Sequence, residues 1–275
     1  NDAYLDAASV NYSSQSISVF LNDKAGVLGS RTDTSTASMA GMTTNPVALD
    51  AKVATNSNYP DIVTANSASD DASLFLSKAG GGLSAPVSRI ASRAPSAVTL
   101  ADVNADTYLD LIIANQLTGN CTVYLGDGKG GFTLKGAYSA GAMPAAVAAT
   151  DFDGDGKVDL LVSLGMDNKV ALLTGNKDGS FNMPLAYTAG MQPAGLALGD
   201  FNGDGRPDIA TALNVDGTVA ILLNVNGVPG APMALAAGSG PQGVAIGDLD
   251  NDGRPDVAVA NSGGSTLSVF LNKSQ

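Results

Sequence analysis

The sequence contains no glutamate, no histidine and no tryptophan, so all 26 of its acidic residues are aspartate. The missing histidine excludes Ser-His-Asp and Cys-His catalytic arrangements, histidine general bases and histidine-ligated zinc. Glutamate favours helices, whereas aspartate and glycine favour turns. The composition therefore indicates strands joined by tight turns, and no amphipathic helix stands out.

Other absences narrow the class of protein further. Cys121 is the only cysteine, which excludes a disulfide within the chain, and its strand-like neighbours predict a buried, inert thiol. There is no run of 18 or more apolar residues, so we expect no membrane insertion. The formal charge of −12 argues against a nucleic-acid partner, because phosphate binding needs a basic face. The chain begins with Asn1 rather than Met, and we expect a processed product or an excised fragment.

The main feature that the chain does contain is an acidic stretch that is repeated along the sequence. Its copies begin at Asp102, Asp151, Asp200 and Asp248, at intervals of 49, 49 and 48 residues. A fixed period near 50 with strand-like flanks means repeated copies of one structural unit. These four stretches hold 14 carboxylates, and four divalent cations would bring the formal charge from −12 to about −4. The acidity is therefore typical of ligand sets rather than of a solvated face.

Each unit contains the same pieces in the same order. A short apolar run headed by proline precedes the acidic stretch, two β-like runs follow it, and a glycine-rich turn leads to a weaker fourth strand. Two further copies are degraded, one at residues 1–6 and one bracketed by Asp50 and Asp61. The first unit lacks its first strand, and the last one ends after its third strand, at Asn272. We expect one domain made of units at about residues 1–49, 50–101, 102–150, 151–199, 200–247 and 248–275.

A four-stranded sheet cannot bury both of its faces alone. Radial packing of several such sheets solves this and leaves only short, protected edges, which is the β-propeller arrangement. A linear solenoid is the rival, but its β-repeats are usually shorter than about 48 residues. The sequence therefore predicts an all-β fold, a β-propeller of four-stranded antiparallel blades.

The repeats resemble the FG-GAP repeats of the integrin α-subunit propeller and of related bacterial and fungal repeat proteins. The resemblance lies in the acidic stretch, in turns that contain Phe132 and Phe181, and in Ala-Gly-x-x-Pro at the start of a unit, as in residues 140–144 and 189–193. It covers nearly the whole chain. It implies that the acidic loops lie between the first and second strands of a blade. That family commonly forms seven blades, whereas this chain has about six units, so the blade number stays open.

The acidic stretches predict calcium sites. Calcium takes six to eight oxygen ligands, and ligands at positions 1, 3, 5, 7 and 9 let a short loop wrap one ion, with position 7 giving its backbone carbonyl. Glycine at position 6 permits the sharp turn. We expect about four Ca²⁺ ions, held by Asp102, Asn104, Asp106, Tyr108 and Asp110; Asp151, Asp153, Asp155, Lys157 and Asp159; Asp200, Asn202, Asp204, Arg206 and Asp208; and Asp248, Asp250, Asp252, Arg254 and Asp256.

Two alternatives bear on these loops. An EF-hand shares the first five positions, but it needs a bidentate glutamate at position 12 and a following helix, and this chain has neither. Plain Asp/Gly turns without an ion would leave several carboxylates repelling one another. The loop at Asp102 has Thr107 in place of the glycine, and the stretch from Asp50 to Asp61, with Asn56 and Asn58, has lost the pattern. In the stretch from Asp50 to Asp61 we therefore expect no ion, whereas the loop at Asp102 keeps its oxygen ligands and stays among the four expected sites.

For function, the sequence favours a non-enzymatic, extracellular module, secreted or on the cell surface, that binds a protein or a glycan in adhesion or recognition. We predict no catalytic residue and no organic cofactor site. The pair Asp70 and Asp71 is read as a solvated turn rather than as a catalytic dyad. A carbohydrate-active enzyme, a lectin and a purely structural array stay open. Sugar-stacking aromatics are limited to four tyrosines in the best-formed units, at positions 108, 124, 138 and 187.

Overall fold

The computed structural model describes residues 6–23, 27–55, 59–78 and 82–273. In these ranges the chain is built of strands and turns and contains no helix, hence no helix long and apolar enough to cross a membrane. The strands form six antiparallel sheets within the described part, four with four strands and two with three. The predicted all-β fold, a β-propeller of antiparallel blades, is confirmed.

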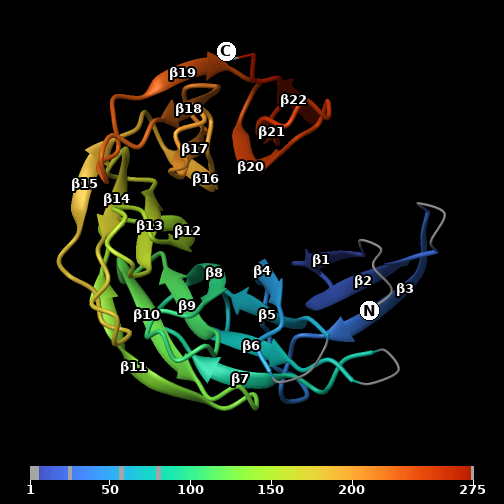
Figure 1. The fold of residues 1–275 in the computed structure, drawn as a ribbon. Coiled ribbons are helices and arrows are strands. Elements are labelled where there is room, and N and C mark those ends of the chain that lie inside the picture. Colours follow the sequence, from blue (N-terminus) through green and yellow to red (C-terminus); the bar gives the residue numbers. More distant parts are fainter. Residues whose placement is uncertain (1–5, 24–26, 56–58, 79–81, 274–275) are drawn as a thin grey trace. The chain divides into compact units, whose positions relative to one another are not determined.

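Contacts divide the chain into two compact units, residues 1–137 and 138–275, which we call the N-terminal and C-terminal units. Figure 1 shows the sheets in chain order. The N-terminal sheets are β1 (Ala7–Asn11), β2 (Ser16–Asn22) and β3 (Leu28–Ser35); β4 (Pro46–Lys52), β5 (Asp61–Asn66), β6 (Asp71–Phe75) and β7 (Val87–Ile90); and β8 (Pro95–Ala101), β9 (Asp110–Asn115), β10 (Asn120–Gly126) and β11 (Phe132–Ser139).

The second unit begins within β11 and holds three further sheets. They are β12 (Pro144–Thr150), β13 (Asp159–Leu164), β14 (Lys169–Leu173) and β15 (Leu185–Thr188); β16 (Pro193–Gly199), β17 (Asp208–Leu213), β18 (Thr218–Leu222) and β19 (Met233–Ala236); and β20 (Pro241–Gly247), β21 (Asp256–Asn261) and β22 (Thr266–Phe270).

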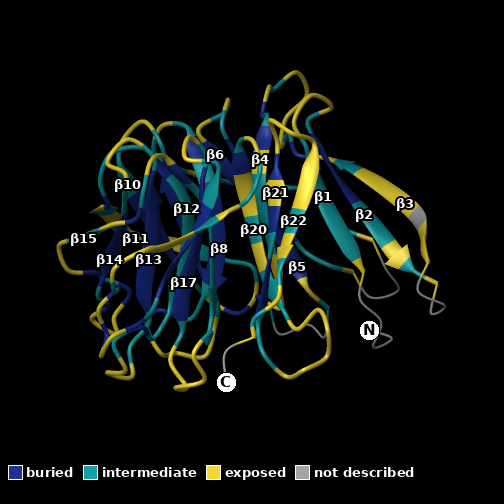
Figure 2. Cartoon of the chain, turned by 90° about the horizontal axis from the view of Figure 1, so that it is seen from above, coloured by how far each residue is buried: buried dark blue, intermediate teal, exposed yellow. Residues whose placement is uncertain are grey.

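Burial differs from strand to strand in a way that the sequence explains. The second strands β9, β13 and β17 are near-continuous apolar runs, and every residue of each is buried, as expected for strands in the middle of packed sheets. The fourth strands are mostly exposed, as in β15 and β19. Figure 2 shows β13 and β17 in the colour of buried residues. Within each unit, successive sheets therefore pack face to face, and the fourth strands are left largely to solvent.

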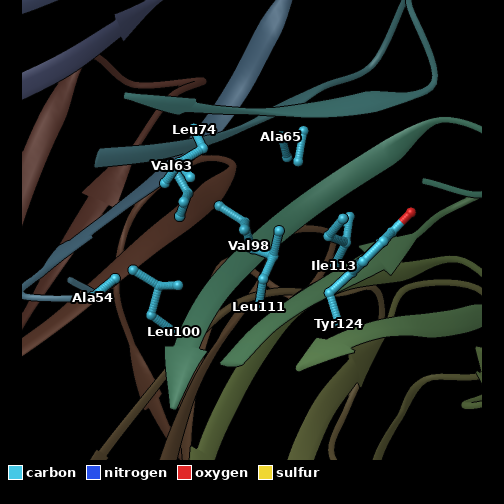
Figure 3. Packing of buried hydrophobic residues seen from close by; sticks show 10 residues of the cluster. Ala54, Val63, Ala65, Leu74, Val98, Leu100, Leu111, Ile113 and Tyr124 are labelled. Carbon is cyan, nitrogen blue, oxygen red and sulfur yellow. The ribbon is translucent and has the colours of Figure 1, made fainter. Parts of the chain in front are cut away.

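Side chains from successive sheets form the core of each unit. In the N-terminal unit, Val63 and Leu74 of one sheet pack with Val98, Leu111 and other residues of the next (Figure 3). In the C-terminal unit the first strands approach closely: a Cβ added at Gly195 in β16 would lie 2.4 Å from the backbone oxygen of Gln242 in β20. A side chain at position 195 is therefore excluded by the packing of β16 on β20.

Two expectations from the sequence are wrong in detail, and one lies outside the described residues. Asp50 does not open a loop; it lies within β4, and its Oδ2 accepts the backbone N–H of Leu100 at 2.9 Å. Asp71 is not solvated: it is buried in β6 and accepts hydrogen bonds from three side chains, those of Asn66, Ser69 and Ser88. Of the acidic remnant at residues 1–6, only Asp6 is described, and Asn56 and Asn58 are not.

Candidate metal centres

Each acidic loop connects the first and second strands of its sheet, the place that the resemblance implied. The loop at Asp102 joins β8 to β9, and the loops at Asp151, Asp200 and Asp248 join β12 to β13, β16 to β17 and β20 to β21. In each case the first strand ends just before position 1, and the second strand begins at position 9. The ligand at position 1 therefore directly follows one strand, and the ligand at position 9 begins the strand that is hydrogen-bonded to it.

The aspartate at position 1 organises the loop backbone. In the loop at 151, Oδ1 of Asp151 accepts the N–H groups of Gly154 and Asp155 at 2.8 and 3.1 Å, and Oδ2 accepts that of Gly156 at 3.0 Å. Asp200 accepts the N–H groups of the corresponding three residues, 203–205. Asp102 and Asp248 each accept two of the three. All four loops thus share one folded form.

Positions 3, 5 and 6 continue this form. In the loops at 102, 151 and 200 the side-chain oxygen at position 3 accepts the N–H at position 5, as Asp153 does from Asp155 at 3.0 Å. The backbone at position 6 is left-handed, with φ of +80° at Gly156 and +83° at Gly205. Thr107 adopts φ of +77° at the same position. The loop at 102 therefore keeps the shared conformation although threonine is strained there.

Two loops bring three carboxylates together. One oxygen from each of Asp151, Asp153 and Asp159 lies within 4.8 Å of the others, and the same holds for the group Asp248, Asp250 and Asp252. In the part of the chain that the structure describes, these are the groups of three or more aspartate or cysteine side chains that could hold a metal ion. Such donor sets suit a hard cation such as calcium. The loops at 102 and 200 have asparagine at position 3, so they offer an amide oxygen in place of one carboxylate.

In two of the loops the cationic side chain at position 7 lies beside the carboxylate at position 5. Lys157 Nζ is 2.6 Å from Asp155 Oδ2, and Arg254 Nη2 is 2.5 Å from Asp252 Oδ2. These contacts lower the pKa of both aspartates, chiefly through the side-chain hydrogen bond from Lys157 or Arg254. Ammonium and guanidinium groups do not bind cations, so in these loops position 7 could offer calcium only its backbone carbonyl, and that role stays a prediction.

The aspartate at position 9 has a second role that sequence reasoning missed. In all six described sheets its Oδ1 accepts the backbone N–H of the residue 16 positions later, at 2.6–2.9 Å. In the four acidic loops its Oδ2 also accepts the N–H at position 2. The aspartates are Asp6, Asp61, Asp110, Asp159, Asp208 and Asp256. A signal for this role was present, because Asp6 and Asp61 persist in units where the rest of the loop is lost.

Burial and hydrogen bonding oppose each other at position 9. Desolvation by burial raises the pKa of Asp110 to about 6, although the N–H groups of Gly126 and Val103 favour its charged form. Burial also raises the pKa of Asp159 and Asp208. At Asp256 the hydrogen bonds from Asn272 and Leu249 are the larger effect, and the pKa is lowered. A cation beside these carboxylates would favour the charged form at every position.

The four tyrosines proposed as sugar-stacking groups lie in different surroundings. Tyr124 is buried, and its hydroxyl donates to the backbone oxygen of Ile90 at 2.5 Å. Tyr138 packs edge-to-face on Phe181, with ring centroids 5.5 Å apart. Tyr187 packs against the core of its unit, and Tyr108, in the loop at 102, is 37% exposed. Tyr108 is therefore the most exposed residue of these four tyrosines.

Solved structures share this fold at low sequence identity. A functionally unknown protein from Desulfotomaculum acetoxidans aligns with a TM-score of 0.67 and 14% identity over 96% of this chain and 78% of its own. A catalytically inactive virginiamycin B lyase from Staphylococcus aureus, solved with quinupristin, has a TM-score of 0.65 and 10% identity over 98% and 81%. The Pseudomonas aeruginosa periplasmic gluconolactonase PpgL has a TM-score of 0.62 and 14% identity over 94% and 67%. At these identities the likeness shows the fold alone.

The repeats themselves match a known family. No curated protein matches this sequence. The model of the FG-GAP-like repeat matches three times, at residues 102–162, 151–211 and 200–259. Each match begins at position 1 of an acidic loop, and together the three span residues 102–259, more than half of the chain. The resemblance drawn from the acidic loops is confirmed, and the chain belongs to the FG-GAP-like repeat family.

Proposed function

We propose that this protein is a calcium-stabilised, extracellular β-propeller that acts as a non-enzymatic binding module for a protein or a glycan. The observation that carries the calcium proposal is the convergence of carboxylate oxygens within 4.8 Å in the loops at 151 and 248. The loops at 102 and 200 have the same backbone hydrogen bonds as these two loops, so we extend the calcium proposal to four sites. Millimolar calcium outside cells suits loops of modest affinity, which favours export.

The donor set fits the ion. Side-chain oxygens at positions 1, 3, 5 and 9 and the carbonyl at position 7 are hard ligands, and the loop can offer five or more of them. Bound calcium would supply a positive charge that offsets carboxylate repulsion. The chain's own part is to hold the first and second strands of a sheet together, because position 1 follows one strand and position 9 begins the other. Ion binding therefore contributes to folding by linkage.

Thermal unfolding in calcium and in excess chelator tests this proposal. One site at 100 times its dissociation constant adds about 2.7 kcal/mol, so the midpoint should rise by at least several degrees in calcium. Substitution of Asp151→Asn and Asp248→Asn together should reduce that rise. Asp178→Asn, in a turn outside the loops, serves as the control and should leave it unchanged. Equal midpoints in calcium and chelator for the unmodified protein would contradict the proposal.

A second candidate function is an enzyme propeller. It is supported by the fold shared with a streptogramin-type lyase and a gluconolactonase, whose names describe those proteins and not this chain. The sequence argues against an enzyme. It lacks histidine and glutamate, and its dense aspartate clusters all lie in the acidic loops proposed to bind calcium. A glycan array probed with and without chelator favours the binding module if a glycan is retained. Turnover of a lactone or release of reducing sugar would favour the enzyme.

A further inference from the structure

The turn after β18 contacts the acidic loop of the preceding sheet. Asn224 is 3% exposed, and its Nδ2 donates to the backbone oxygen of Phe152, 72 residues earlier, at 2.7 Å. Its Oδ1 accepts the N–H of Gly227 at 2.7 Å, which fixes the amide orientation. Phe152 is position 2 of the loop at 151 and lies between Asp151 and Asp153. The amide therefore holds the main chain between two predicted ligands.

The same contact recurs one sheet later. Asn272 Nδ2 donates to the backbone oxygen of Phe201, 71 residues earlier, at 2.9 Å, and Phe201 is position 2 of the loop at 200. The backbone N–H of both asparagines also satisfies the position 9 aspartate of their own sheet. In the sheet β12–β15 this place is taken by Gly175, whose N–H makes the same bond to Asp159 without a side chain. The backbone bond to the position 9 aspartate thus forms without the side-chain amide, so a substitution can remove the contact to the preceding loop and keep this bond.

A close packing contact strengthens the connection. A Cβ added at Gly227 would lie 2.7 Å from Cβ and 2.8 Å from Cα of Asp153. Asp153 is the position 3 ligand of the loop at 151. The turn from Asn224 to Gly227 therefore packs directly against a predicted ligand of the neighbouring sheet. A displacement of this turn would displace Asp153, and a displacement of Asp153 would displace the turn.

We propose that Asn224 and Asn272 are positioning residues that shape the acidic loop of the preceding sheet for calcium, at 151 and 200 respectively. This inference rests on the proposed function, since it concerns the same loops. Ordering of the loop by the amide lowers the entropy lost when the ion binds. By linkage, an ion in the loop strengthens in return the contact between the two sheets. Calcium would then stabilise the stacking of sheets as well as each sheet alone.

Hydrogen exchange measured peptide by peptide during a calcium titration of the full chain tests this. Asn224→Gly copies the residue found at Gly175. It should raise the calcium midpoint of the peptide covering 151–159 by roughly fivefold, which corresponds to about 1 kcal/mol for one hydrogen bond. The peptide covering 248–256 should be unaffected. Asn272→Gly should shift the midpoint of the 200–208 peptide and not that of 151–159, so each variant is the control for the other.

A second pair of variants tests the packing contact. Gly227→Ala places a methyl group against Asp153. Gly41 has a similar φ, +83° compared with +85° at Gly227, but the Cβ added by Gly41→Ala would have nothing within 4 Å. Gly227→Ala should weaken calcium protection of the 151 loop, and Gly41→Ala should not. This pair also serves if Asn224→Gly fails to fold.

The outcomes separate the two proposals. If calcium protects no loop in the unmodified protein, the proposed calcium function fails. If calcium protects the loops but the Asn224, Asn272 and Gly227 variants leave their midpoints unchanged, the calcium sites stand and the positioning role is overturned. A shift of the same size in every loop would also overturn it, because a general loss of stability has no preference for the preceding sheet.

Discussion

The Nζ atom of Lys273 lies 2.5 Å from Oδ2 of Asp250 and 3.6 Å from Oδ2 of Asp252, within one of the two carboxylate clusters. The hydrogen bond to Asp250 raises the pKa of Lys273, so the ammonium stays charged at neutral pH. No such ammonium from outside the loop contacts the cluster at 151 in the described part of the chain. The loop at 248 thus carries a cation of its own where calcium is predicted to bind.

We expect Lys273→Met to raise the calcium affinity of the loop at 248. The ammonium must leave the carboxylates when a divalent cation binds, and its removal abolishes that competition. Because Lys273 is largely exposed, the gain should be small, about twofold, and should shrink at high salt. Calcium titration followed by exchange of the 248–256 peptide measures it. Lys177→Met, at an exposed lysine of another turn, is the control; an equal gain there would refute a local effect.

Thr107→Gly should stabilise the protein by about 1 kcal/mol. Thr107 has φ of +77°, which costs a β-branched L-residue about 1–2 kcal/mol, while glycine adopts it freely and loses part of the gain to chain entropy. Urea unfolding of both proteins in chelator measures the difference. Thr118→Gly, in a turn without positive φ, should instead reduce stability. If Thr107→Gly is also destabilising, the strain at this position is refuted.

Asp159→Ala and Asp155→Ala should separate the structural role of the loop from its ion-binding role. Asp159 is buried and accepts the N–H groups of Phe152 and Gly175, so its loss should cost about 3 kcal/mol even in chelator. Asp155 bonds the ammonium and the backbone N–H of Lys157 at the loop surface, so its loss should cost far less in chelator than that of Asp159 and matter chiefly in calcium. Free energies of unfolding in both conditions measure this. Equal costs in chelator would contradict the distinction.

Cys121 should be unreactive in the folded protein. It is fully buried in β10, and burial raises the pKa of its thiol from 9.0 to about 12. A thiol reagent at pH 8 should label it only after denaturation. As pH rises above 9 the unfolded chain releases this proton while the folded chain retains it, so stability falls. Between pH 8 and 10 the free energy of unfolding should fall by about 1 kcal/mol more in the unmodified protein than in Cys121→Ala, as measured by denaturant unfolding.

Local patterns predicted the strands and loops well because each is decided by neighbours in sequence. The apolar run that begins at Asp208 predicted β17, and the prolines at 144, 193 and 241 marked the starts of β12, β16 and β20. The alternating ligands placed the acidic loops between first and second strands. The surroundings of Asp50 and Asp71 were misjudged because each carboxylate also bonds a residue far along the chain, Leu100 or Ser88, which no local pattern reveals.

By itself, the sequence determined the repeat, its period, the all-β character and the donor atoms of each loop, since these follow from residue type and spacing along the chain. Only the tertiary structure decided which groups meet between sheets. The contact from Asn224 to Phe152 spans 72 residues, and in the preceding sheet, β12–β15, Gly175 stands at the place of Asn224. Such contacts depend on how one sheet is stacked on the next, and that stacking is set by the packing of both faces together.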